Sequence, residues 1–170
     1  MFELSKFKKA NAQFQGKGVF KCEGTFYHLT PNNLGEIVYL EPREPKVENF
    51  KSLCVANYLM GCLVAMPEEK QEQDTFFLYR NFQPCTAYRE VLDSGLRLNE
   101  AKIFEKSKFI RIGKVHHCTK FFEELRQHGN IVYWNDEQVL QKFLRHLTIE
   151  KEKNTSIILV SYSNGKYTLA

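Results

Sequence analysis

The stretch from residue 25 to residue 66 constrains the fold of this chain more than any other part of its sequence. It opens with an aromatic, strand-like run that contains His28, continues through a turn and two prolines, Pro42 and Pro45, and ends in the apolar segment from Leu53 to Met66. A histidine at the end of a strand, followed by a turn and then a buried apolar segment, favours the floor of a cleft over simple core packing.

The composition is that of a folded protein with one proper core. A chain of 170 residues with 43% hydrophobic and 14% aromatic residues is long enough and apolar enough to exclude a disordered tail. The longest apolar stretch, residues 53–66, is too short to span a bilayer. The first residues lack the apolar core of a secretory signal, so none is expected.

Cysteine usage predicts a reducing compartment. The chain has five cysteines, at positions 22, 54, 62, 85 and 118. They form no CxxC pair, and an odd number leaves one unpaired in any disulfide scheme. We therefore expect reduced thiols and a cytoplasmic, intracellular location, in the cell of origin or in a host cell.

The positive charge is concentrated at the N-terminus. The first 21 residues contain five lysines and one glutamate, which accounts for the whole net charge of +4. We expect residues 1–18 to form a basic arm. Such an arm can hold nucleic acid or another acidic partner by counterion release, although most arms of this kind are only soluble leaders.

Apolar periodicity predicts both strands and helices in the first two thirds of the chain. Residues 19–29 alternate as one or two strands with a break at Gly24, and residues 75–79 form a buried aromatic strand. The helical spacing of apolar residues over 54–66 predicts a buried helix. After Pro84 we expect irregular chain with two short strands, at residues 101–104 and 109–112.

The last third predicts a separate α-β-α-β unit over residues 117–170. Its expected elements are a helix at 119–127 capped by Thr119, a strand at 130–134, a helix at 136–147 and a hairpin formed by 156–162 and 166–169. We expect this unit to be appended to a main domain that spans residues 19–116.

Residues 26–34, Phe-Tyr-His-Leu-Thr-Pro-Asn-Asn-Leu, resemble the opening of small ADP-ribosyltransferase-fold proteins, many of them from phages or bacteria. The first strand of that group reads tyrosine-histidine-x-serine/threonine-proline and is followed by an asparagine-leucine pair. Later blocks match in order: a proline-rich turn at 42–45, a strand-to-helix step at 54–63, an aromatic strand at 76–79 and a glutamate before a short strand at 99–104. Over residues 20–116 the resemblance implies an α+β fold, with a pair of small antiparallel sheets and flanking helices.

The resemblance also implies a reaction. Proteins of this fold that are active bind NAD between the sheets and break the bond between nicotinamide and ribose, as an ADP-ribosyltransferase or an NAD glycohydrolase. Because the transition state resembles an oxocarbenium ion, a nearby anion stabilises it, and Glu100 matches that role. His28 matches a group that bonds the adenosine ribose or the diphosphate. The acceptor is an unknown protein or nucleic acid.

Further residues are implied as NAD contacts. Tyr58 or Tyr27 is expected to stack on nicotinamide, and Thr30 completes the histidine-x-threonine motif. Ala56 stands where the family usually carries a small polar residue, and Asn57 is expected to replace the missing hydrogen bond.

Other interpretations remain open at this stage. Taken singly, His28 and Tyr58 also suit a packed core, and Glu100 suits a solvated surface. Glu90 and Glu105 are rival carboxylates. The presence of Ala56 also agrees with a catalytically inactive binding module on the same fold.

A different enzyme class is the two-histidine phosphodiesterases. Their signature is a repeated triplet, and His28-Leu29-Thr30 recurs here as His146-Leu147-Thr148. In that class the two histidines serve as base and acid on one phosphate. The run His116-His117-Cys118 suggests a zinc site, but three adjacent residues do not fit one tetrahedral centre, so no metal is expected.

Overall fold

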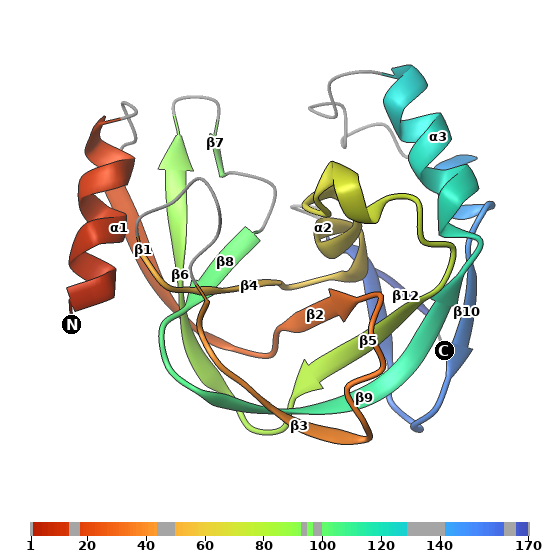
Figure 1. Cartoon of the computed structure of the whole chain (residues 1–170), viewed down its shortest axis with the longest axis horizontal. Coiled ribbons are helices and arrows are strands. Elements are labelled where there is room, and N and C mark those ends of the chain that lie inside the picture. Colours follow the sequence, from red (N-terminus) through yellow and green to blue (C-terminus); the bar gives the residue numbers. More distant parts are fainter. Residues whose placement is uncertain are drawn as a thin grey trace.

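The structure is a computed structural model, and the part of the chain that it describes comprises residues 2–13, 18–43, 50–92, 95–96, 100–128, 142–161 and 166–169. These residues form a mixed α+β fold that is dominated by one open, mostly antiparallel sheet and carries few helices (Figure 1).

The elements follow one another along the described chain as strands with short helices between them. The strands of the large sheet are β1 (Gly18–Gly24), β2 (Tyr27–Thr30), β3 (Ile37–Leu40), β4 (Leu53–Ala56), β5 (Phe76–Asn81), β6 (Cys85–Leu92), β7 (Gly95–Leu96), β8 (Glu100–Ile103), β9 (Ser107–His116) and β10 (Thr148–Lys151). The helices are α1 (Phe2–Gln13), α2 (Leu59–Val64) and α3 (Cys118–His128), with a 3₁₀ turn at Glu68–Lys70; β11 (Ile157–Ser161) and β12 (Lys166–Leu169) form a separate two-stranded sheet.

The large sheet consists of two halves that meet at one residue pair. The order β1-β6-β8-β4 makes one half and β2-β5-β9-β10 makes the other; β7 lies beside β6, and β3 lies beside β9. Strands β2 and β4 are paired only between Tyr27 and Ala56, whereas β4–β8 and β2–β5 each pair over four residues. The two halves therefore part immediately beyond this contact. Figure 1 shows the sheet as a curved band with α2 inside the curve.

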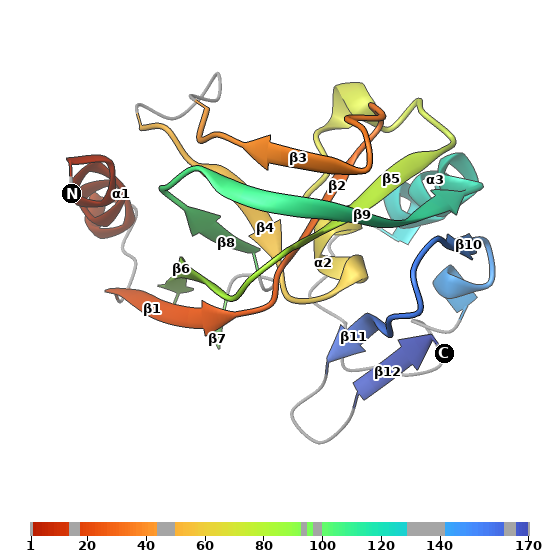
Figure 2. The same ribbon diagram turned by 90° about the horizontal axis from the view of Figure 1, so that it is seen from below.

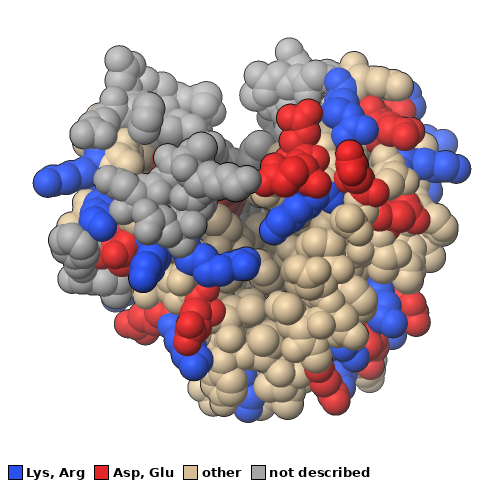
Figure 3. Space-filling view, in the orientation of Figure 1, with Lys and Arg blue, Asp and Glu red and all other residues tan. Residues whose placement is uncertain are grey.

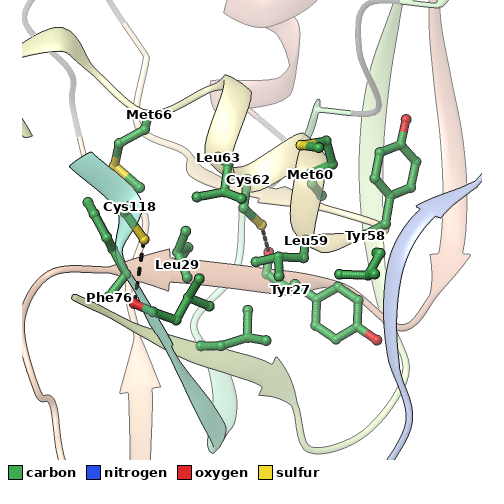
Figure 4. Close-up of a cluster of buried hydrophobic side chains, with 14 of the residues drawn as sticks. Tyr27, Leu29, Tyr58, Leu59, Met60, Cys62, Leu63, Met66, Phe76 and Cys118 are labelled. Carbon is green, nitrogen blue, oxygen red and sulfur yellow. Dashed lines mark hydrogen bonds between the residues drawn. The ribbon is translucent and has the colours of Figure 1, made fainter. Parts of the chain in front are cut away.

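One hydrophobic cluster joins the predicted domain 19–116 to the predicted unit 117–170. Phe121 and Phe122 of α3, together with Ile157 and Val160 of β11, pack into the same cluster as β2, α2 and β5. Figure 4 shows the part of this cluster around α2. Strand β10 also pairs with β9 in the large sheet. Figure 2 shows the two-stranded sheet β11–β12 beside the large one, with α1 at the opposite end of the molecule.

A second cluster draws on both halves of the sheet, with residues of β4 and β8 from one half and of β5 and β9 from the other. It contains Phe26, Leu53, Val55, Tyr79 and Phe109. The segment predicted as a basic arm forms α1 over residues 2–13.

Helix α1 is held to the sheet by an aromatic contact. Phe7 is buried and packs on Phe50 and Phe104 at ring distances of 5.3 and 5.8 Å. The sequence pattern did not predict this helix because its apolar residues do not gather on one face.

Several predicted strands are confirmed. Residues 19–29 form β1 and β2 with the break after Gly24, residues 75–79 lie in β5, and residues 156–162 and 166–169 supply the paired strands β11 and β12. The helix predicted at 119–127 is also present, as α3. The strand predicted at 130–134, and the helix predicted at 136–147 as far as residue 141, lie outside the described residues.

Two local predictions are wrong. Residues 54–66 do not form one helix, because 53–56 form strand β4 and the helix begins only at Leu59. The chain after Pro84 is not irregular, because residues 85–92 form β6, which pairs with β1 along seven residues. In both places, pairing with distant strands outweighs the local pattern.

The N-terminus of α3 is stabilised from another part of the chain. Thr119 was expected as its N-cap, but the helix already begins at Cys118. The carboxylate of Asp74 accepts hydrogen bonds from the Thr119 hydroxyl at 2.7 Å and from its backbone N–H at 3.3 Å. The Thr119 hydroxyl bond is the main cause that lowers the pKa of Asp74.

No helix in the described part of the chain is long and apolar enough to cross a membrane.

Gly113 permits the close approach of β9 and β10. A Cβ at this position would lie 2.7 Å from the backbone oxygen of Glu150, which is closer than real Cβ contacts allow. We expect Gly113→Ala to destabilise the fold by about 2 kcal/mol through overpacking, measured by urea unfolding. Lys21→Ala, at an exposed position of the outer strand β1, is the matched control and is expected to change stability by less than about 0.5 kcal/mol. Equal stabilities of the two variants would contradict the steric argument.

Candidate functional site

A cavity of about 700 Å³ opens where β2 and β4 part. Strands β2, β4 and β8 contribute His28, Cys54 and Glu100 to its lining, and α2 with the turn after it contributes Cys62 and Met66. Arg43, Ser52, Glu69 and Lys70 complete its polar lining. Figure 3 shows a hollow in the surface between the α1 side and the α2 side of the molecule.

Two of the residues predicted for the site meet in this cavity. His28 lies on β2 and Glu100 lies at the start of β8, yet both line the same space. The sheet brings them together because β4 lies between their strands, paired with β8 along its length and with β2 at Ala56.

The other predicted NAD contacts do not line the cavity. Tyr27 and Tyr58 are buried in the hydrophobic cluster around α2 (Figure 4), and the Tyr27 hydroxyl accepts a hydrogen bond from Ile158 N at 3.2 Å. The Thr30 hydroxyl accepts a bond from Asn32 N at 3.2 Å. Asn57 has a buried Oδ1 for which the described residues supply no hydrogen-bond partner.

His28 is held as a neutral side chain in one tautomer. Its Nδ1 lies 3.1 Å from the backbone oxygen of Cys54, and because a carbonyl oxygen only accepts, Nδ1 must carry the proton. Burial, and to a smaller extent the positive charges of Arg43 and Lys70, lower the His28 pKa to about 4 against the opposing effect of this bond. The second ring nitrogen, Nε2, is then an unprotonated acceptor.

Glu100 is oriented by a buried lysine. The Lys102 ammonium lies 3.4 Å from Glu100 Oε1, and the lysine is only 4% exposed. The same ammonium lies over the rings of Phe7 and Phe50 at 5.8 and 5.6 Å, so α1 covers it. An ion pair with one partner buried and the other open to a cavity fixes the carboxylate at the cavity wall.

The rival carboxylates lie elsewhere. Glu90 accepts a hydrogen bond from Asn11 of α1 at 3.4 Å, and Glu105 is exposed in the loop between β8 and β9. Neither is a lining residue of the cavity. Among the three candidates, the geometry favours Glu100.

Sequence reasoning missed the cationic part of the site. Arg43 is positioned by a two-way backbone pairing with Ser52, with N–O distances of 3.0 and 2.9 Å. Lys70 ends the 3₁₀ turn after α2. Only Lys102 carried a usable signal, since a lysine inside the apolar strand Ala101–Ile103 requires a buried partner.

His116 and His117 are engaged away from the cavity. His116 contacts Glu150 at 2.9 Å and Thr75 at 3.1 Å, and His117 contacts the Thr148 hydroxyl at 3.0 Å. Cys118 is buried. Within the described residues, no group of three or more possible ligands is placed to hold a metal ion. His146 does not line the cavity of His28, so the two triplets do not meet there.

The arrangement offers a neutral acceptor, two carboxylates (Glu69 and Glu100) and two cations (Arg43 and Lys70) around one apolar-walled space. Such a set suits a ligand that carries hydroxyl groups and negative charge, since hydroxyls donate to His28 and anions pair with Arg43 or Lys70. No protein-family model, curated protein or solved structure matches this chain.

The His28 assignment predicts an unusual titration. In nuclear magnetic resonance spectra, its ring is expected to stay neutral at pH 5.5 in the folded protein and to titrate near its ordinary pKa of about 6.5 in urea. Because the unfolded chain binds a proton more readily between those pKa values, this group lowers stability as pH falls from about 6.5 to about 4. His28→Gln identifies the resonance and should remove that part of the slope. A folded-state midpoint above pH 6 would contradict the neutral tautomer.

Proposed function

We propose that this protein is an NAD-consuming enzyme, an ADP-ribosyltransferase or NAD glycohydrolase, whose cavity between β2 and β4 binds NAD. The observation that carries the proposal is that His28 and Glu100 line one cavity at the parting of the two half-sheets. The motif around His28 and the glutamate that begins β8 are two of the blocks on which the resemblance to ADP-ribosyltransferase-fold proteins rests.

The size and charge of the cavity support this substrate. Ligand sites in proteins have volumes of about 300–1,000 Å³, and a volume of about 700 Å³ falls inside that range. Arg43 and Lys70 supply positive charge for a diphosphate, and both are close enough to influence the His28 pKa. Leu29, Met66 and Pro67 give an apolar wall for a base.

The proposed chemistry assigns different roles to the two predicted residues. Breaking the bond from nicotinamide to ribose leaves positive charge on the ribose, and the acceptor or water then forms the new bond at that carbon. The Glu100 carboxylate, oriented by Lys102, stabilises the developing cation. His28 Nε2 accepts a hydrogen bond from a hydroxyl of NAD, which positions the substrate.

The decisive experiment measures NAD consumption directly. The full chain is incubated with NAD labelled in its adenosine half, alone and with a cell extract, and both nicotinamide release and transfer of label are followed. Release without transfer supports glycohydrolysis, and transfer supports a protein or nucleic-acid acceptor. NAD binding without turnover supports the inactive binding module. A chain that neither binds nor consumes NAD would sink the proposal.

Glu100→Gln tests the catalytic carboxylate. The substitution keeps the size of the side chain and removes its charge, so we expect NAD turnover to fall by about a hundredfold, in line with electrostatic groups in other enzymes. NAD affinity should change little, because the charge acts mainly in the transition state. Glu105→Gln is the matched control, since Glu105 is exposed outside the cavity. Unchanged turnover in Glu100→Gln would remove this residue from the mechanism.

His28→Ala is expected to behave differently. Loss of the Nε2 acceptor should weaken NAD binding together with turnover, because the hydrogen bond forms before the reaction begins. Binding is measured by calorimetry and turnover by nicotinamide release. His28→Gln retains an amide that can hydrogen-bond and should recover part of the affinity. If His28→Ala bound NAD with full affinity, His28 would not accept a hydrogen bond from a hydroxyl of NAD.

A further inference from the structure

Three of the five large hydrophobic side chains that are exposed in the described residues come from neighbouring strands. They are Ile37 and Tyr39 of β3 and Phe82 directly after β5, which are 51%, 59% and 49% exposed. Strand β9 lies between them, because it pairs with β3 on one side and with β5 on the other. Figure 2 shows β3 and β9 side by side at one margin of the molecule. Exposed apolar side chains that gather in this way mark a binding surface more often than chance scatter does.

Strand pairing places both aromatic rings on the same side of the sheet as a lysine. Tyr39 is directly opposite Lys108, and the backbone N–H of Phe82 donates to the Lys108 carbonyl at 2.8 Å. Residues opposite each other in antiparallel strands share one side of the sheet, so these three form a row across β5, β9 and β3. Two strand spacings separate Phe82 from Tyr39 by about 10 Å, with the lysine between them.

Each exposed ring has a cation beside it. The Lys108 ammonium lies 4.2 Å from the centre of the Phe82 ring, and the Lys106 ammonium lies 5.7 Å from that of Tyr39. Lysines held at the edge of an exposed aromatic surface give it positive charge next to a stacking platform.

A third cation lies on the same side of the sheet. Arg80 of β5 is opposite Ile110, which is in turn opposite Ile37. Its guanidinium donates to the Thr155 hydroxyl at 3.2 Å. Tyr39, Phe82, Arg80, Lys106 and Lys108 are called the aromatic face below.

The charges of the aromatic face are open to an anionic partner. Among the described residues, the one carboxylate paired with these cations is Glu41, which lies 3.2 Å from Lys106. Both side chains of that pair are more than half exposed, and an ion pair of this kind contributes little to stability, so a phosphate can replace Glu41. Arg80 and Lys108 form no ion pair within the described residues.

We propose that the aromatic face binds single-stranded nucleic acid. Unpaired bases stack on Tyr39 and Phe82, and the three cations contact the phosphates. A duplex keeps its bases stacked on one another, so it offers the same face only its phosphates. None of the five residues lines the cavity, and the inference does not depend on NAD.

The test uses the full chain, freed of nucleic acid, and a fluorescein-labelled oligothymidylate of about 20 nucleotides, longer than the ~4–16 that one such site covers. Fluorescence anisotropy gives the Kd at about 50 and 200 mM salt. We expect binding that weakens as salt rises and that is at least about tenfold tighter than binding to a duplex of equal length. No measurable binding at the lower salt, or equal affinity for the duplex, would overturn the proposal.

Substitutions assign the binding to the aromatic face. Tyr39→Ala and Phe82→Ala should each weaken binding by about tenfold without changing its salt dependence, because stacking releases no counterions. Lys108→Gln should instead lower the slope of log Kd against log salt by about 0.7, the value for one phosphate of a single strand. Phe20→Ala is the matched control, an exposed aromatic on β1 at the other end of the sheet, and should bind as the wild type does. A loss in Phe20→Ala equal to that in Tyr39→Ala would contradict the assignment.

Two further measurements separate this face from other modes of binding. Lys8→Gln alters an exposed lysine of α1 and should leave most of the affinity intact. If Lys8→Gln abolished binding and Tyr39→Ala did not, α1 would hold the strand and the proposal would fail. Light scattering detects self-association. A dimer that Tyr39→Ala separates, in a chain that does not bind oligothymidylate, would assign the face to a second copy of the protein and overturn the proposal.

Discussion

The contact between Tyr27 and Ala56 is the constraint on which the rest of the structure depends. It is the only residue pair that joins β2 to β4, so it holds two half-sheets together while leaving their strands to diverge. A longer ladder would close the sheet and remove the space between the strands. Packing in the second hydrophobic cluster also joins the two halves. The cavity exists because the pairing stops after one step.

The divergence also determines which polar groups become available. Where strands part, backbone groups lose their ladder partners and must find others. The Cys54 carbonyl accepts its bond from the His28 ring, which crosses the gap between β4 and β2. The same bond places the proton of the His28 ring on Nδ1 and leaves Nε2 as an unprotonated hydrogen-bond acceptor. The need of the Cys54 carbonyl for a hydrogen-bond partner thus fixes the tautomer of the His28 side chain.

The buried ammonium of Lys102 links the half-sheet that contains β8 to the cavity. Lys102 pairs with Glu100 and Cys54, and the aromatic rings of Phe7 and Phe50 cover it from the side of α1. A buried ammonium is costly unless it is paired, so removing any one of these partners affects the others. Helix α1 therefore contributes to the state of the cavity wall although it does not line the cavity.

Local pattern was sufficient for the elements that carry a strong apolar or turn signal, such as β5, α3 and the β11–β12 pair, because those signals act between near neighbours. It also singled out His28 and Glu100, on motifs alone. It did not separate strand β4 from helix α2, since both are apolar and only the pairing of β4 with β8 distinguishes them. Tertiary structure decided three further features. His28 and Glu100 line one cavity, Lys102 is buried, and Cys54 is exposed whereas Cys62 is buried. Each of them depends on strand pairing between residues far apart in the chain, and a linear sequence does not state which strands will pair.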